Sequence, residues 1–120
     1  MKSLSRLGLS VLAVTGSAAV AMAADLCPTE AEVQSAITHY ITDVYWSPGE
    51  REIWKITDVS GFTFGSAKFA KPQPGRCAVR VEYSFKVTHA DGRVDNPTMG
   101  AGKTMYFYRN DFGEWEFSVG

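Results

Sequence analysis

The feature that most constrains this fold is the segment 77–88, in which apolar and polar side chains alternate without interruption. A period of two places successive side chains on opposite faces of a β-strand. One apolar face and one polar face are typical of an antiparallel sheet that is covered on one side. The predicted buried positions are Cys77, Val79, Val81, Tyr83, Phe85 and Val87.

A helix is predicted upstream of this strand. Thr29, followed three residues later by Glu32, matches a capping box. Apolar residues then recur at helical spacing, which predicts one buried stripe formed by Val33, Ile37, Tyr40, Ile41 and Val44. The Ser-Pro-Gly segment 47–49 is expected to end the helix.

The rest of the chain favours further strands. Residues 53–69 are rich in β-branched and aromatic side chains, and Gly61 and Gly65 indicate a bulge or bend. Residues 96–102 favour a loop, whereas strands are predicted at 104–109 and 115–119, with turns at 91–92 and 110–113. One helix followed by four or five antiparallel strands predicts an α+β fold.

Over residues 28–120, this element order resembles the cystatin-like superfold, in which a long amino-terminal helix packs across one curved antiparallel sheet. NTF2-like proteins share that plan with additional helices. The ending 110–117, a tight turn with Gly113 before Trp115, is similar to the last hairpin of many such domains. Cystatins that inhibit cysteine proteases carry a Gln-x-Val-x-Gly loop. This chain has no such loop, so the resemblance does not imply protease inhibition.

Residues 1–23 have the three parts of an export signal. Lys2 and Arg6 supply positive charge, the uncharged run 7–20 is apolar, and Ala21-Met22-Ala23 provides a cleavage site. The apolar run is shorter than the roughly 20 residues that span a membrane. We therefore expect a periplasmic or secreted protein, cleaved near Ala23.

The mature chain is then predicted to be a single domain, 24–120, without a membrane anchor. Leu26 precedes Cys27 where a lipoprotein signal requires a small residue, which argues against lipid attachment. Cleavage leaves 10 basic and 13 acidic residues, a net charge of −3. This charge gives no global attraction to nucleic acid, so a nucleic-acid partner is not expected.

Two cysteines, Cys27 and Cys77, remain in the mature chain. Export predicts that they form a disulfide, which would join the start of the helix to the start of the alternating strand. Closing a loop of this length stabilises the fold by roughly 4 kcal/mol in the loop-entropy model. The alternative is a reactive thiol, but the chain has no Cys-x-x-Cys motif.

The polar face of the sheet is one candidate binding surface. It is predicted to carry Arg80, Glu82 and Lys86, together with Tyr106 and Tyr108 if Met105 and Phe107 are the buried pair of their strand. Tyrosine and arginine are common anchors of protein interfaces. The alternative is a solvated face with cross-strand ion pairs, such as Arg80 with Glu116.

A second candidate is the cluster of Lys68, Lys71 and Arg76 in a proline-containing loop. Such a cluster can bind a phosphate, a cell-wall polymer or an acidic protein. The alternative is ordinary solvation of a charged loop.

Residues capable of catalysis are scattered in the sequence. His39 and Asp43 share a helix face, but no third metal ligand is spaced to join them. His89, beside the 91–92 turn, is predicted to be a solvated turn residue, and Asp58 an outward-facing strand carboxylate rather than a general acid or base. No metal, cofactor or catalytic set is predicted.

These observations favour a small exported interaction protein that binds a protein or a cell-envelope component through the sheet face or its loops. The alternative is a small-molecule-binding protein or enzyme with a pocket between helix and sheet, suggested by Tyr40, Trp54 and Asp58.

Overall fold

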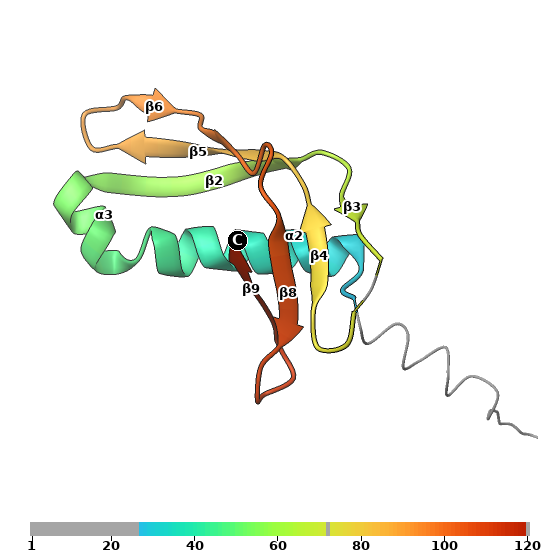
Figure 1. Ribbon diagram of the computed structural model, residues 1–120. Helices are drawn as coiled ribbons and strands as arrows, with labels where there is room; N and C mark the ends of the chain where they lie inside the picture. The colour runs from blue at the N-terminus through green and yellow to red at the C-terminus, as the bar shows by residue number, and fades with distance from the viewer. Residues whose placement is uncertain (1–26, 72, 120) are drawn as a thin grey trace, which may run out of the picture.

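Helices form the first part of the domain, and antiparallel strands form the rest (Figure 1). The computed structural model describes residues 27–71 and 73–119, so the predicted export signal lies outside the described residues. The helical elements are α2 (Glu30–His39), the π-helical segment η1 (Tyr40–Tyr45) and α3 (Pro48–Trp54). The strands are β2 (Ile56–Phe64), β3 (Lys68–Phe69), β4 (Cys77–Arg80), β5 (Tyr83–His89), β6 (Val94–Asp95), β7 (Thr98–Met99), β8 (Met105–Arg109) and β9 (Trp115–Val119). The predicted α+β class is confirmed.

The capping box at the start of α2 is confirmed. The Thr29 hydroxyl accepts a hydrogen bond from the Glu32 backbone N–H at 3.1 Å, and the Glu32 carboxylate accepts one from the Thr29 N–H at 2.8 Å. These two bonds satisfy backbone donors that a helix start otherwise leaves unpaired.

The predicted buried stripe of this helix is only partly correct. Val33, Ile37 and Ile41 are fully buried, but Tyr40 is 37% exposed and Val44 54% exposed. Val44 lies within the π-helical segment η1, whose last turn is closed by a bond from the Trp46 N–H to the Ile41 carbonyl. Because a π-turn holds more residues than an α-turn, it rotates the later side chains away from the core.

A second helix replaces the predicted start of the first strand. The Ser47 hydroxyl accepts a hydrogen bond from the Glu50 N–H, and Pro48 occupies the first turn, where its missing N–H costs nothing. The Arg51 guanidinium donates to the carbonyls of Thr42 and Trp46, both at 2.7 Å, and so ties α3 to the end of η1. The predicted strand start at residue 53 was therefore wrong, and β2 begins at Ile56.

The alternating segment is confirmed in its burial, since all six predicted apolar positions are buried. It forms two strands, however, which belong to different sheets. β4 lies in a four-stranded antiparallel sheet of order β3-β4-β8-β9, and β5 pairs with β2 on one side and with β6 and β7 on the other. Two sheets thus replace the single curved sheet that was predicted.

The break between the two sheets falls at Val81–Glu82, where backbone contacts from other segments intervene. The Gly65 N–H donates to the Glu82 carbonyl at 2.8 Å. Gly100, at φ +87°, lies so close to β4 that a Cβ there would be 2.2 Å from the Val81 carbonyl oxygen. Only glycine fits such an approach.

Two smaller predictions concern a bulge in β2 and the segment 96–102. The pairing of β2 with β5 shifts register between Ser60 and Thr63, which confirms a bulge around Gly61. The prediction of a loop at 96–102 was only partly correct. This segment contains β7, in which Met99 pairs with Tyr83 of β5. That pairing is local to the hairpin, and its two residues are too few to leave a periodic signal.

The disulfide between Cys27 and Cys77 is confirmed. It joins Cys27, three residues before the start of α2, to the first residue of β4, and its Cys77 half is buried. A disulfide is typical of an oxidising, exported environment. In the described part of the chain, no helix is both long and apolar enough to cross a membrane. The buried residues of the helix and of both sheets form one continuous core.

Candidate functional site

Four basic side chains gather around β3 and β4 and form what we call the basic face: Lys68, Lys71, Arg76 and Arg80, all of them exposed. Arg76 and Arg80 alternate with the buried Cys77 and Val79 and therefore point away from the core. Lys68 lies directly opposite Arg80 in the antiparallel pairing of the two strands. Like charges in directly opposite positions destabilise a sheet. The face thus concentrates positive charge at a small cost to the fold.

The contacts of these cations are with neutral groups. The Arg76 guanidinium carbon lies 4.6 Å from the centre of the Tyr106 ring, a cation–π contact, and Arg80 Nε donates to the Thr104 hydroxyl at 3.1 Å. Within residues 27–71 and 73–119, none of the four forms an ion pair with a carboxylate. A guanidinium has five N–H donors in a fixed fork, so the Thr104 contact leaves most of the fork of Arg80 available.

A groove of about 560 Å³ runs beside the basic face. Lys68 and Arg80 line it together with Glu82 and the glycine-containing segments 65–66 and 100–102. An Arg fork beside a lysine is suited to a carboxylate or a phosphate. Glu82 in the same groove repels an anion, so the anion is expected on the Lys68–Arg80 side.

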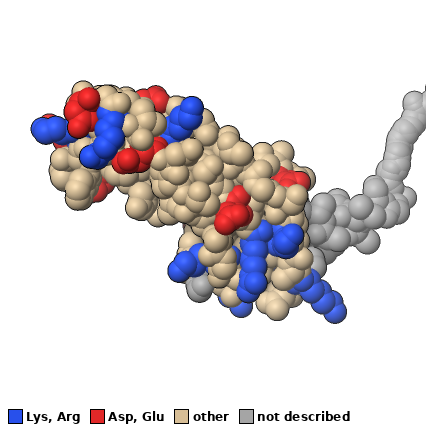
Figure 2. Space-filling view, turned by 90° about the horizontal axis from the view of Figure 1, so that it is seen from above, with Lys and Arg blue, Asp and Glu red and all other residues tan. Residues whose placement is uncertain are grey.

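Figure 2 shows how charge is distributed along the molecule. Basic side chains dominate the end next to the grey trace, where Figure 1 places β3 and β4. At the opposite end, where α3 and the β5–β6 hairpin lie, basic and acidic side chains are interleaved. A largely uncharged belt separates the two ends in this view.

The residues predicted to form one binding surface lie on two different sheets. Tyr106 joins the basic face through Arg76, but Lys86 lies on β5 in the other sheet, with its stem against Gly61. Tyr108 donates its hydroxyl to Glu116 at 3.3 Å. The expected Arg80–Glu116 ion pair is not formed. Glu116 lies opposite Tyr108 in β9 and also accepts from the Asn110 side chain.

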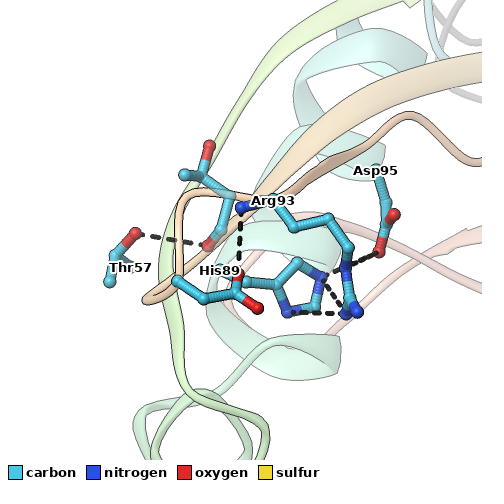
Figure 3. A network of polar contacts seen from close by, with 6 residues as sticks. Thr57, His89, Arg93 and Asp95 are labelled. Atoms are coloured by element: carbon cyan, nitrogen blue, oxygen red, sulfur yellow. Dashed lines mark hydrogen bonds and ion pairs between the residues drawn. The ribbon is translucent and has the colours of Figure 1, made fainter.

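His89 is not the solvated turn residue that was predicted. Its side chain is 14% exposed, and its Nε2 lies 2.8 Å from Asp95 Oδ2 (Figure 3). The Arg93 guanidinium approaches the same ring at 3.1–3.2 Å and lies 3.8 Å from Asp95. The 91–92 turn sets a short hairpin that brings these residues together, with Val87 opposite Asp95 and Thr88 opposite Val94.

This network serves the hairpin itself. Asp91 accepts a hydrogen bond from the Arg93 backbone N–H at 2.9 Å, and this bond lowers the pKa of Asp91. In the network shown in Figure 3, each charged side chain meets a partner of the same hairpin. The carboxylate of Asp95 is therefore engaged by His89 and Arg93.

The other candidates for catalysis lie on the surface. His39 Nδ1 pairs with Asp43 at 2.8 Å, with both side chains exposed. Asp58 is also exposed and accepts a hydrogen bond from the Ser60 hydroxyl. Among the residues that the structure describes, no group of three or more His, Cys, Asp or Glu side chains is placed to hold a metal ion.

A pocket of about 380 Å³ lies between the helical segment and the sheets. Tyr40 lines it, but Trp54 and Asp58, which also suggested such a pocket, do not. Three further lining residues were not predicted: Tyr45 in η1, Tyr83 in β5, and Lys103 in the loop before β8. No local sequence pattern predicts these three lining residues, because only the tertiary fold brings them together.

Comparison with known proteins adds no family. No protein-family model matches the chain, and searches of curated proteins and of solved structures found no significant match.

Proposed function

We propose that this chain is an exported binding protein that uses the basic face to recognise an acidic protein or an anionic polymer of the cell envelope. The observation that carries the proposal is the cross-strand pair of Lys68 and Arg80, two like charges held opposite each other without a carboxylate partner in the described chain. A bound anion would relieve their repulsion. The charge arrangement that slightly destabilises the free fold would therefore favour binding of an anion.

Neighbouring groups support a macromolecular partner. Arg76 and Tyr106 extend the surface along β8, and arginine and tyrosine are enriched among residues that anchor interfaces. Lys71 continues the positive charge into the loop after β3. Several separated cations suit a polyanion better than a single small ion, because each cation contacts a different charge.

The proposal includes the finer features of the fold and of export. The signal at 1–23 would direct the chain to the periplasm or the medium, where the Cys27–Cys77 disulfide is stable. The structure shares with the cystatin-like plan a helix packed on antiparallel strands, although these strands form two sheets rather than one.

The test is affinity capture from an envelope extract with the mature protein immobilised in its disulfide form. Captured proteins and polymers are quantified for the parent and for the variant Lys68→Glu/Arg80→Glu. Because this change reverses the charge at the centre of the face, we expect at least tenfold lower recovery of the specific partner. Raising the salt concentration should weaken capture by the parent in the same way, since exposed charges are screened.

The matched control is Lys86→Glu, which reverses an exposed lysine on β5 outside the basic face. It should retain the partner. Equal recovery by the parent and the Lys68→Glu/Arg80→Glu variant would exclude the basic face. Equal loss in all variants would show that only net charge matters, and would contradict a specific surface.

A further inference from the structure

The pocket between the helical segment and the sheets is separate from the basic face and is built from several elements. Tyr40 and Tyr45 come from η1, Tyr83 from β5, Met105 from β8, and Phe117 from β9. Its volume of about 380 Å³ falls within the range of roughly 300–1,000 Å³ that is usual for small-molecule sites. In Figure 1, the helical segment crosses behind β8 and β9.

Most of the pocket wall is apolar. Met99, Met105 and Phe117 supply thioether and aromatic surface, and the Tyr40 ring packs edge-on against Phe117 with centroids 5.3 Å apart. Met105 is buried, so this part of the wall belongs to the hydrophobic core. Such a lining favours a ligand with an apolar body, since burial of its carbon surface drives binding.

The polar side chains of the pocket wall include three tyrosines and one lysine. Within the described chain, the hydroxyls of Tyr40, Tyr45 and Tyr83 have no hydrogen-bonding partner, and the Lys103 ammonium forms no ion pair. All three tyrosines line this pocket, and burial, together with the nearby Tyr40 and Tyr45, raises the pKa of Tyr83. Three neutral hydroxyls and one cation complement an oxygen anion.

We propose that this pocket binds an apolar monocarboxylate, such as a medium-chain fatty acid. The hydrocarbon lies against Met105 and Phe117, and the carboxylate faces Lys103 and the tyrosine hydroxyls. The site does not depend on the proposed function of the basic face, because Lys68 and Arg80 do not line the pocket.

One wall of the pocket is fixed by a glycine. Gly100 and Ala101 line it, and Gly100 is held against the Val81 carbonyl at a distance that excludes any side chain. The Lys103 N–H also bonds to the Gly100 carbonyl at 3.1 Å. The loop that carries Lys103 is therefore positioned before a ligand arrives, which reduces the ordering cost of binding.

The test is calorimetric titration of the mature protein with octanoate and, separately, with 1-octanol, which has the same apolar body without the charge. We expect octanoate to bind more tightly than octanol. Lys103→Gln should weaken octanoate binding by about tenfold and leave octanol binding unchanged, because it removes only the charge-assisted contact. Lys86→Gln is the matched control and should bind as the parent does.

Methyl NMR spectra of the methionines provide a second measurement that does not depend on a variant folding. Octanoate should shift the Met99 and Met105 methyl signals of the parent. Shifts absent at both methionines, no octanoate binding at millimolar concentration, or equal affinity for octanol would each overturn the proposal. Sedimentation could also reveal a dimer that forms in competition with octanoate. If Lys103→Gln left the affinity of that dimer unchanged, the proposal would likewise be overturned.

Two outcomes keep this proposal distinct from the proposed function. Lys68→Glu/Arg80→Glu should leave octanoate affinity unchanged, and Lys103→Gln should leave capture of the envelope partner unchanged. A change in octanoate affinity on reversal of the basic face would contradict the separation of the two sites.

Discussion

The two ends of the molecule differ in how their charged side chains are paired. In the β5–β6 hairpin, His89, Arg93 and Asp95 contact one another, so positive and negative groups compensate locally. On the basic face, Lys68 and Arg80 lie opposite each other, and their contacts with the described chain include no carboxylate. A charge that is paired within the fold stabilises the fold. A charge that faces another of the same sign destabilises it slightly and remains available to a partner.

Chain connectivity explains part of the difference. The hairpin is closed by the short turn at 91–92, so residues close in sequence face one another and can form local pairs. β3 and β4 are joined through the segment 70–76, whose charged residues, Lys71 and Arg76, are both basic. The following predictions test this contrast.

The largest expected effect is loss of the disulfide, which anchors only the end that carries the basic face. Cys27→Ala/Cys77→Ala should lower the free energy of unfolding by roughly 4 kcal/mol, because the open chain regains the entropy of a loop that separates residues 50 apart. Urea unfolding measures this loss, and hydrogen exchange should show β4 losing protection before the β5–β6 hairpin does.

Reduction of the parent with dithiothreitol is the control for the disulfide variant, since it opens the loop without changing the buried side chain at Cys77. Both forms should lose stability together. Equal loss of protection at both ends would show that the ends unfold as one unit and would weaken the contrast.

A matched pair of neutralisations tests the charges directly. Asp95→Asn should destabilise the fold by about 0.5–1 kcal/mol, because it removes the charge that His89 and Arg93 contact at a half-exposed site. Lys68→Gln should leave stability unchanged or raise it by about 0.3 kcal/mol, because it relieves repulsion with Arg80. Both values come from thermal or urea unfolding at low salt. If Lys68→Gln were as destabilising as Asp95→Asn, the cations of the basic face would be stabilising the fold.

The smallest effect concerns Tyr83, near the junction of the two sheets. Burial raises its pKa above the ordinary value of 10.0. The folded state therefore keeps the proton longer than the unfolded state does. This contribution to stability is complete below the unfolded pKa and is lost as the pH rises through the folded pKa. Near neutral pH, Tyr83 makes no contribution to the pH dependence of the stability.

Urea unfolding between pH 8 and pH 11 measures the contribution of Tyr83. Tyr83→Phe should show a shallower loss of stability above pH 10 than the parent, because the variant has no proton to lose at that position. Tyr108→Phe, on the exposed side of β8, is the matched control and should follow the parent. Identical alkaline slopes for the parent and Tyr83→Phe would contradict the role of burial.

Local patterns were sufficient for much of the fold. The capping box at Thr29 and Glu32, the alternation through Val79 and Phe85, and the turn at 91–92 all depend on interactions between residues close in sequence. The predicted export signal supplied the reason to pair Cys27 with Cys77 across 50 residues. Charge clustering around Lys68, Lys71 and Arg76 was visible for the same reason, since these residues are near one another in the chain.

Other features required the tertiary structure. The alternating segment was predicted as one strand because Val81 and Glu82 continue the pattern, but Gly65 and Gly100 contact their backbone and divide it between two sheets. The π-helical segment η1 moved Val44 out of the core, a change that side-chain spacing does not encode.

The sequence by itself therefore determined the class of fold, the disulfide and the presence of unbalanced positive charge, because each depends on composition, compartment or short-range periodicity. The tertiary structure decided which charges are paired and where the pocket lies. Lys68 lies opposite Arg80, and Tyr83 lines one pocket with Tyr40, only after the strands and the helix are brought together. Such contacts depend on register and packing, which no local pattern specifies.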